Sequence, residues 1–281
     1  TGDDDANHGR SAASPKASIQ AILDAYDLEP GDTVYVDTGT FVSEATIKLG
    51  PEDYGNPAAY VRIVGAGMYR TLLERHLPSS LPSDETQRGV IRIYGTSSSG
   101  PSYVSVEDIA LTGGVYGVNF SATECCHLIR CRVFGNSQTG IKGARSFRIT
   151  VKNCLVYSNG KAGISLESGG GSRVENSTVA LNGGPQVNVA YYRSWSDACR
   201  IVGNLLWAEG PGTRCLSYWH STDNITESDF NCLYVSGGAT VGVVFDGGGA
   251  VLTDWQTATG LDLHSISVDP LFANPASGDF H

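Results

Sequence analysis

The chain has 281 residues, of which 35 are glycine, and carries a formal net charge of −10 with only 17% charged side chains. This acidic balance argues against a nucleic-acid partner, because phosphate backbones are bound by clusters of lysine and arginine. No apolar run approaches the roughly 18 residues of a membrane span, so membrane insertion is not expected. Seven cysteines are an odd number, so at least one lies outside any intrachain disulfide, and the pairing stays open.

The chain opens with an acidic stretch and a short amphipathic segment. Residues 1–13 are predicted to be a disordered acidic tail, and the alternative is that Asp3, Asp4 and Asp5 hold calcium. Ser14 followed by Pro15 is typical of a helix start. Apolar residues then recur at helical spacing, namely Ile19, Ile22, Leu23 and Tyr26. We predict a helical cap over residues 14–28 that covers the first coil, since an uncovered sheet end invites edge pairing.

A repeat runs through the body of the chain, from about residue 31 to about residue 260. Short runs rich in Val, Ile and Tyr recur at intervals of about 22 to 28 residues, with Gly, Asn and Ser between them. A repeat of this length indicates a solenoid, and the units are too short and too strand-like for paired helices. We therefore predict stacked coils of parallel strands, about 4.8 Å apart.

Four asparagines head successive repeats: Asn153, Asn176, Asn204 and Asn231. In stacked coils the same residue type lies over itself, and an Asn side chain can pass amide hydrogen bonds from one coil to the next. We expect these four residues to form a ladder inside a corner of the solenoid, which ends at Cys131 and Asp108 of the earlier coils. Their role is therefore interpreted as structural rather than catalytic.

Two stretches resemble a known family. The opening SPKASIQAILDAYDLEPGDTVYVDTGTF resembles the start of right-handed parallel β-helix proteins of the pectate-lyase-like superfamily, and the close SVDPLFANPASGDFH resembles their usual ending. The resemblance implies an all-β fold, a single right-handed parallel β-helix with a short N-terminal capping helix and a closing segment at residues 261–281. Family chains usually run on beyond Gly-Asp-Phe, so we expect this one to be truncated at His281 and to be part of a longer polypeptide.

The resemblance also implies carbohydrate, although a fold alone does not choose an activity. Such proteins occur as modules of large secreted or surface proteins of bacteria, which implies an extracellular or cell-surface location. We expect a module that recognises a polysaccharide or glycan, or that serves as a scaffold. The alternatives are a calcium-dependent lyase acting on an acidic polysaccharide and a structural stalk or filament subunit that stacks through its truncated C-terminal end.

In this family, ligands lie along the outer face of the strand that follows each Gly-rich break. We align six residues as inward: Val118, Ile141, Ile164, Val187, Leu216 and Val243. Alternation along a strand then predicts one outward row of Asn119, Lys142, Ser165, Asn188, Ser217 and Val244. A second outward row contains Ser121, Ala144, Glu167, Ala190, Trp219 and Asp246.

Aromatic side chains gather near the end of these rows. The predicted substrate-binding residues are Tyr192, Trp195, Trp219, His220 and Asp246. Exposed rings with a few polar neighbours suit a sugar, which offers CH faces and hydroxyl groups. The alternative is that one or two of the rings fold back over a corner of the coil.

Catalytic residues can be assigned only if the lyase alternative holds. Lys142 or Arg145 would then supply the base or bind the substrate carboxylate, and Glu167 would help to hold calcium. The competing interpretation is a salt bridge between coils on a solvated face, which contributes little. A glycoside hydrolase is less favoured, because Glu167 and Asp246 are three coils apart, about 14 Å, and paired carboxylates need about 5 to 10 Å. Whether the protein is an enzyme therefore stays open.

Overall fold

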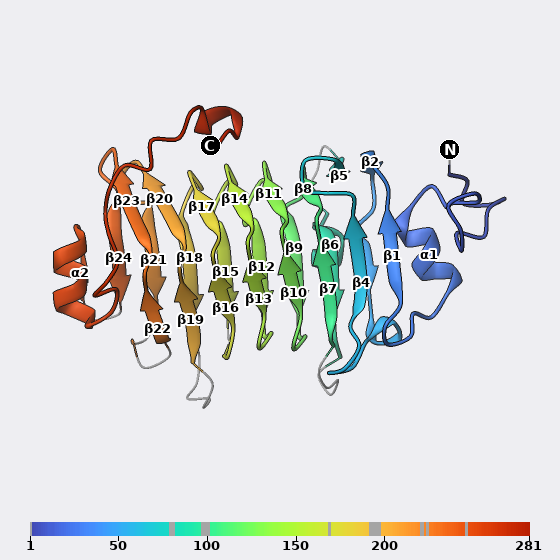
Figure 1. Ribbon diagram of the computed structural model, residues 1–281, viewed down its shortest axis with the longest axis horizontal. Coiled ribbons are helices and arrows are strands. Elements are labelled where there is room, and N and C mark those ends of the chain that lie inside the picture. The colour runs from blue at the N-terminus through green and yellow to red at the C-terminus, as the bar shows by residue number, and fades with distance from the viewer. Residues whose placement is uncertain are drawn as a thin grey trace.

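The computed structural model describes residues 2–78, 82–96, 102–167, 170–190, 198–219, 222, 225–244 and 247–281. The chain winds into a solenoid whose coils stack along the long axis of the molecule (Figure 1). Each coil contributes one strand to each of three sheets, and neighbouring strands in a sheet are parallel and in register. The predicted all-β solenoid with a short N-terminal helix is confirmed.

The strands follow a fixed order from sheet A to sheet B to sheet C in each coil. Sheet A contains β1 (Thr33–Val36), β4 (Val61–Gly65), β7 (Val104–Glu107), β10 (His127–Ile129), β13 (Thr150–Lys152), β16 (Arg173–Glu175), β19 (Cys199–Val202) and β22 (Ile225–Asp229). Sheet B contains β2 (Gly39–Ser43), β5 (Thr71–Arg75), β8 (Ala110–Thr112), β11 (Arg132–Phe134), β14 (Leu155–Tyr157), β17 (Thr178–Ala180), β20 (Leu205–Glu209) and β23 (Cys232–Ser236). Sheet C contains β3 (Ile47–Leu49), β6 (Gly89–Tyr94), β9 (Tyr116–Ser121), β12 (Ile141–Ala144), β15 (Ile164–Glu167), β18 (Pro185–Ala190), β21 (Arg214–Tyr218), β24 (Thr240–Val244) and β25 (Gly247–Gly249), the last antiparallel to β24. Short 3-10 helices lie at η1 (Pro51–Asp53), η2 (Glu85–Gln87) and η4 (Pro275–Ser277).

The core lies inside the coils, where apolar residues stack in columns. On sheet C, five of the six residues predicted to point inward are in register and fully buried: Val118, Ile141, Ile164, Val187 and Leu216. Burial of such aliphatic side chains, at about 25 cal/mol per Å² of apolar surface, is the main stabilising contribution of the fold.

The inward prediction is wrong by one residue in the last coil of sheet C. Gly242 pairs with Leu216, and Val243 takes the outward position that was predicted for Val244. The reason is the Trp255 ring, because a Cβ atom at Gly242 would lie 2.6 Å from it. Only glycine leaves room for that ring at this position.

A helix covers the N-terminal end of the solenoid. Helix α1 (Ile19–Ala25) packs against β1 and β3, with Ile19 and Leu23 buried. Its N-cap is Ser18, whose Oγ accepts a hydrogen bond from Ala21 N at 3.2 Å. The predicted start at Ser14 is therefore wrong, and the helix begins four residues after Pro15.

The acidic residues before this helix take part in turns. The Asp4 carboxylate accepts hydrogen bonds from the backbone N–H groups of Ala17 and Ser18 at 2.7 and 2.9 Å. Asp3 Oδ1 accepts from the backbone of Asp5 and Ala6 in the same way. These carboxylates satisfy backbone donors that would otherwise need water.

The C-terminal end of the coils is also covered. Helix α2 (Leu252–Thr259) lies at the opposite end of the solenoid from α1 (Figure 1). Its Trp255 is fully buried, touches Gly242 and Gly249, and donates from Nε1 to Asp262 Oδ2 at 2.9 Å. In the described residues, α2 and β25 thus cover the C-terminal end of the coil stack, and the stalk alternative stays a prediction.

The predicted asparagine ladder is confirmed for two of its four residues. At the corner between sheets A and B, Asn204 and Asn231 are buried, and Asn204 Nδ2 donates to Asn231 Oδ1 at 3.2 Å. Asn153 and Asn176 stand one position earlier in their coils, are exposed, and have positive φ angles of 54° and 49°. The ladder prediction is therefore wrong for these two residues, which serve instead as left-handed turn residues.

The buried column at this corner continues with other residue types. Ser177 N donates to Asn204 Oδ1 at 3.0 Å, and Cys154 N donates to Ser177 Oγ at 3.1 Å. Cys131 occupies the same buried column, as expected, whereas Asp108 has a φ of 57° and belongs with the left-handed residues. The predicted residues thus came from two adjacent columns.

A second, unpredicted ladder fills the corner between sheets B and C. Asn136 Nδ2 donates to Asn159 Oδ1 at 2.9 Å, and Asn159 Nδ2 donates to Asn182 Oδ1 at 2.9 Å. Asn182 Nδ2 then donates to Gln186 Oε1 at 2.8 Å. All four side chains are buried, so the ladder supplies their hydrogen bonds without water.

A strap formed by residues 266–281 returns over the outer face of sheet B (Figure 1). Its Phe280 ring lies 5.0 Å from the ring of Tyr157, and its Phe272 ring lies 6.2 Å from that of Trp207. The two strap rings are 5.0 Å apart. Ala180 stands between Tyr157 and Trp207 in the register of the sheet, so the strap rings bridge the coil that has no ring of its own.

All seven cysteines lie among the described residues, and none of them forms a disulfide. Burial raises the pKa of several of the thiols, to about 12 for Cys126 and Cys154. Such thiols remain protonated at neutral pH and pack as small apolar groups. Within the described part of the chain, the helices are too short or too polar to cross a bilayer.

Candidate functional site

The outer face of sheet C has the rows that the sequence predicts. Lys142 pairs with Asn119 on one side and with Ser165 on the other, and Ser165 pairs with Asn188. In the second row, Ser121, Ala144, Glu167 and Ala190 are likewise in register. Side chains from coils far apart in sequence therefore lie next to one another, one about every 4.8 Å.

The residues predicted for the lyase alternative lie on neighbouring coils but form no ion pair with one another in the described residues. Lys142 Nζ lies 4.8 Å from the centre of the Tyr116 ring and 3.4 Å from its hydroxyl. Arg145 is exposed, and its backbone N–H donates to the Glu167 carbonyl at 3.0 Å. The predicted salt bridge between coils is thus replaced by a cation–π contact, which holds the ammonium group of Lys142 against an aromatic ring.

Trp219 lies on the outer face of sheet C, with 62% of its surface exposed. It follows Tyr218 directly, and its backbone N–H donates to the carbonyl of Val189 at 3.2 Å, which places it beside Ala190. Tyr192, Trp195, His220 and Asp246 lie outside the described residues. The cluster that was predicted around Trp219 therefore stays a prediction for those four residues.

Polar side chains run beside Trp219 in the neighbouring row. Asn188 Nδ2 donates to Ser165 Oγ at 3.0 Å, while Asn188 Oδ1 is buried and has no hydrogen-bond partner among the described residues. The Oδ1 atom of Asn119 in the same row is in the same state. A buried carbonyl oxygen without a donor is costly, so each of these two atoms has an unused capacity to accept a hydrogen bond.

No group of three or more His, Cys, Asp or Glu side chains comes together in the described residues in a way that would hold a metal ion. Glu167, which was predicted to help to hold calcium, has Ala144 and Ala190 as its register neighbours. A calcium site at this position remains an untested prediction.

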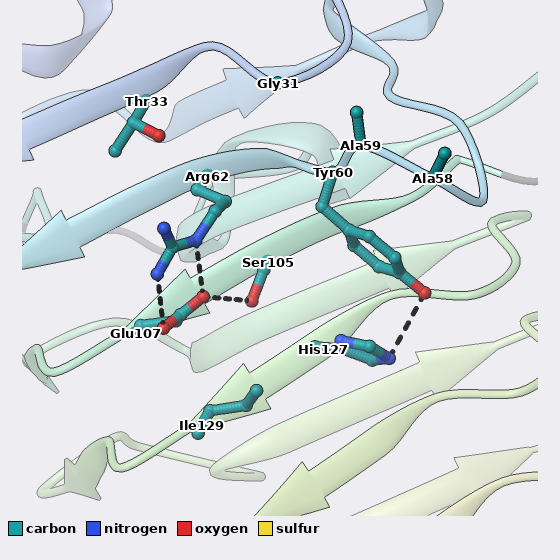
Figure 2. Close-up of a pocket in the computed structure, with 10 residues that line it drawn as sticks. All are labelled: Gly31, Thr33, Ala58, Ala59, Tyr60, Arg62, Ser105, Glu107, His127 and Ile129. Atoms are coloured by element: carbon teal, nitrogen blue, oxygen red, sulfur yellow. Dashed lines mark hydrogen bonds and ion pairs between the residues drawn. The ribbon is translucent and has the colours of Figure 1, made fainter.

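A hollow of about 420 Å³ lies elsewhere, on the outer face of sheet A, across strands β1, β4, β7 and β10 (Figure 2). One wall is an ion pair in which Arg62 donates to both oxygens of Glu107, from Nε and Nη2, each at 2.9 Å. Glu107 also accepts from Ser105 Oγ at 2.9 Å and from Arg130 at 3.1 Å. The Arg62 contact lowers the pKa of Glu107, so this carboxylate stays ionised and is unsuited to donate a proton.

The other wall of the hollow is aromatic. The rings of Tyr60 and His127 stack with centres 4.5 Å apart, and the Tyr60 hydroxyl lies 3.3 Å from His127 Nε2 (Figure 2). Burial lowers the pKa of His127, so the imidazole is uncharged at neutral pH. Burial also raises the pKa of Tyr60 to about 12, so its hydroxyl is a hydrogen-bond group rather than a base.

Comparison with known proteins agrees with this architecture. Residues 91–206 match the family described as a right handed beta helix region. The protein is a right-handed parallel β-helix. Among solved structures, it is similar to pectate lyase Pel9A, with 15% identity, a TM-score of 0.55, and coverage of 99% of this chain and 82% of that one. No sequence among curated proteins matches the chain.

Two further solved structures share the β-helix fold. The A-module of the mannuronan C-5 epimerase AlgE4 of Azotobacter vinelandii has 19% identity and a TM-score of 0.50, with 76% of this chain and 59% of that chain covered. ORF18 of Geobacillus virus E2 has 13% identity and a TM-score of 0.56, with 85% and 55% covered. At these identities the likeness is one of fold, which confirms the β-helix inferred from the opening and closing motifs.

Sequence reasoning located the sheet C face of this β-helix but missed the hollow on sheet A. Tyr60 and His127 are 67 positions apart, and Arg62 and Glu107 are 45 apart. The signal that could have found them is the coil register, which places Arg62, Ser105 and His127 in one outward column. That register is difficult to read from the sequence, because the coils before residue 111 differ in length and give no regular repeat.

Proposed function

We propose that this β-helix is a carbohydrate-recognising module, and that it binds a polysaccharide along the outer face of sheet C. The observation that supports this most is Trp219, a large aromatic side chain held 62% exposed at the end of an outward row. An exposed indole offers a flat apolar face on which the CH groups of a sugar ring can stack. The names of two structural relatives, a pectate lyase and a mannuronan epimerase, support a polysaccharide as that partner.

The geometry of the row suits a sugar ring. Ala190 separates Trp219 from Glu167, so those two larger side chains stand two coils apart, about 10 Å. One ring could lie over Ala190 with a CH face against the indole, since sugars stack on aromatic faces. Asn188 of the neighbouring row, which is partly exposed, would meet its hydroxyl groups. A location outside the cell, where such chains occur, is part of the same proposal.

Trp219→Ala tests the proposal directly. The protein is titrated with a panel of neutral and acidic polysaccharides by calorimetry, and we expect the variant to bind at least tenfold more weakly with a melting temperature close to wild type. Tyr69→Ala is the matched control, because Tyr69 is 58% exposed and lies just before β5 of sheet B, away from both sheet C and the hollow on sheet A. Unchanged binding by Trp219→Ala would contradict the proposed site.

The lyase alternative is checked in the same samples. Each polysaccharide is incubated with and without calcium, and absorbance of an unsaturated product is followed. We expect no product, because no group of three or more acidic side chains comes together with Glu167 in the described residues to hold calcium. Product that disappears in Lys142→Ala would instead establish the lyase.

A further inference from the structure

We propose that the hollow on sheet A is a second binding site, independent of sheet C, and that it takes a single uncharged sugar unit. Its volume of about 420 Å³ lies within the range of small-molecule sites, about 300 to 1,000 Å³. It is lined by residues of four successive strands and the loops before them, and its ion-pair wall and its aromatic wall lie on either side of Ser105 (Figure 2).

The charges around the hollow balance one another. Arg62 and Arg130 both contact Glu107, and Arg130 also contacts Asp108 at 2.7 Å, so two cations meet two anions. A ligand carboxylate placed against Arg62 would lie close to Glu107 and be repelled by it. A neutral ligand avoids that repulsion, which is the reason for inferring an uncharged sugar rather than a uronate.

The groups that remain available are hydrogen-bond groups suited to hydroxyls. Arg62 uses Nε and Nη2 for Glu107, which leaves Nη1 without a partner among the described residues, directed toward Thr33 (Figure 2). His127 uses Nε2 for Tyr60, which leaves Nδ1 without a partner there as well. Ser105 Oγ donates to Glu107 and can still accept. Donors and acceptors fixed on opposite walls match the vicinal hydroxyls of a sugar ring.

The position of the hollow would allow the protein to bind sugar at two separate places. The hollow lies on sheet A near the N-terminal cap, and Trp219 lies on sheet C near the other end of the solenoid. Two sites on different faces can hold two separate chains, or two parts of one branched chain. Linked weak sites reach a higher overall affinity than either site alone.

The test uses saturation-transfer difference NMR on the full chain. Methyl glycosides of glucose, galactose, mannose and N-acetylglucosamine are each added at millimolar concentration. Glucuronate and galacturonate are added in parallel as negatively charged comparison ligands. We expect saturation transfer to at least one neutral glycoside and at least fivefold weaker transfer to the uronates. Transfer should persist in Trp219→Ala, which separates this site from sheet C.

Two variants locate the site. Thr33→Trp places a large ring at the rim of the hollow and should abolish transfer, whereas Thr150→Trp, in the same outward column one strand beyond His127, should not. His127→Phe keeps a ring against Tyr60 but removes Nδ1, and should weaken binding at least fivefold even if Thr33→Trp fails to fold. Absence of transfer from every neutral glycoside, wild-type transfer in both hollow variants, or tighter binding of a uronate would overturn the proposal.

Discussion

Asparagine serves two different purposes at two corners of the same coil. Asn159 and Asn182 lie inside the corner between sheets B and C, are 2% exposed, and exchange hydrogen bonds with the coils on either side. Asn153 and Asn176 lie on the outside of the corner between sheets A and B and have left-handed backbones. The inner pair is needed for its amide group, and the outer pair for its tolerance of positive φ.

The difference shows that residue type and spacing do not define a role in a solenoid. Asn153 and Asn176 are separated by the same 23 positions as the inner pair, since each pair marks equivalent places in consecutive coils. What distinguishes them is which side of the coil the position faces. The following predictions test that distinction, beginning with the largest expected effect.

Asn159→Ala should be the most damaging substitution. The side chain takes part in five hydrogen bonds, two of them accepted from Asn136, and its loss leaves several buried groups without partners. We expect the free energy of unfolding, measured in urea, to fall by about 3 kcal/mol. A loss under about 1 kcal/mol would mean that water replaces the amide and that the ladder is dispensable.

Asn204→Ala should be intermediate. Its side chain takes part in three hydrogen bonds, with Ser177, Val174 and Asn231, so fewer buried groups are orphaned. We expect a loss of about 2 kcal/mol by the same measurement. Asn204→Ser should recover part of it, because Ser177 fills the preceding position of this column. If Asn204→Ala destabilised the protein as much as Asn159→Ala, the number of side-chain hydrogen bonds would not determine the loss of stability.

Asn176→Ala should have the smallest effect and lower the free energy of unfolding by about 1 kcal/mol. The reason is that alanine is strained in a left-handed backbone, because of its β-carbon. Asn176→Gly should be within about 0.5 kcal/mol of wild type, because glycine adopts this backbone freely and Gly203 already occupies the next position of the column, with a φ of 70°. Equal losses for the alanine and glycine variants would indicate that the Asn176 side chain, rather than its backbone, matters.

The sequence predicts the fold because the repeat, the alternation and the terminal motifs all agree. The position of Trp219 on the outer face of sheet C follows from that alternation, and the structure has it there. The asparagine phase was misjudged because a left-handed residue and a ladder residue are adjacent at every corner, and a one-residue shift exchanges them. The hollow is missed by sequence reasoning because Arg62 and Glu107 belong to two coils of irregular length, whose register is hard to read from the sequence.

The strap changes how the end of the solenoid can come apart. A stack of coils in which each contacts only its neighbours is free to fray one coil at a time from either end. Phe272 and Phe280 instead tie the coil of Trp207 to the coil of Tyr157, skipping the one between them. Peeling away the last coils therefore requires the strap to leave first, so these coils unfold together as one cooperative unit.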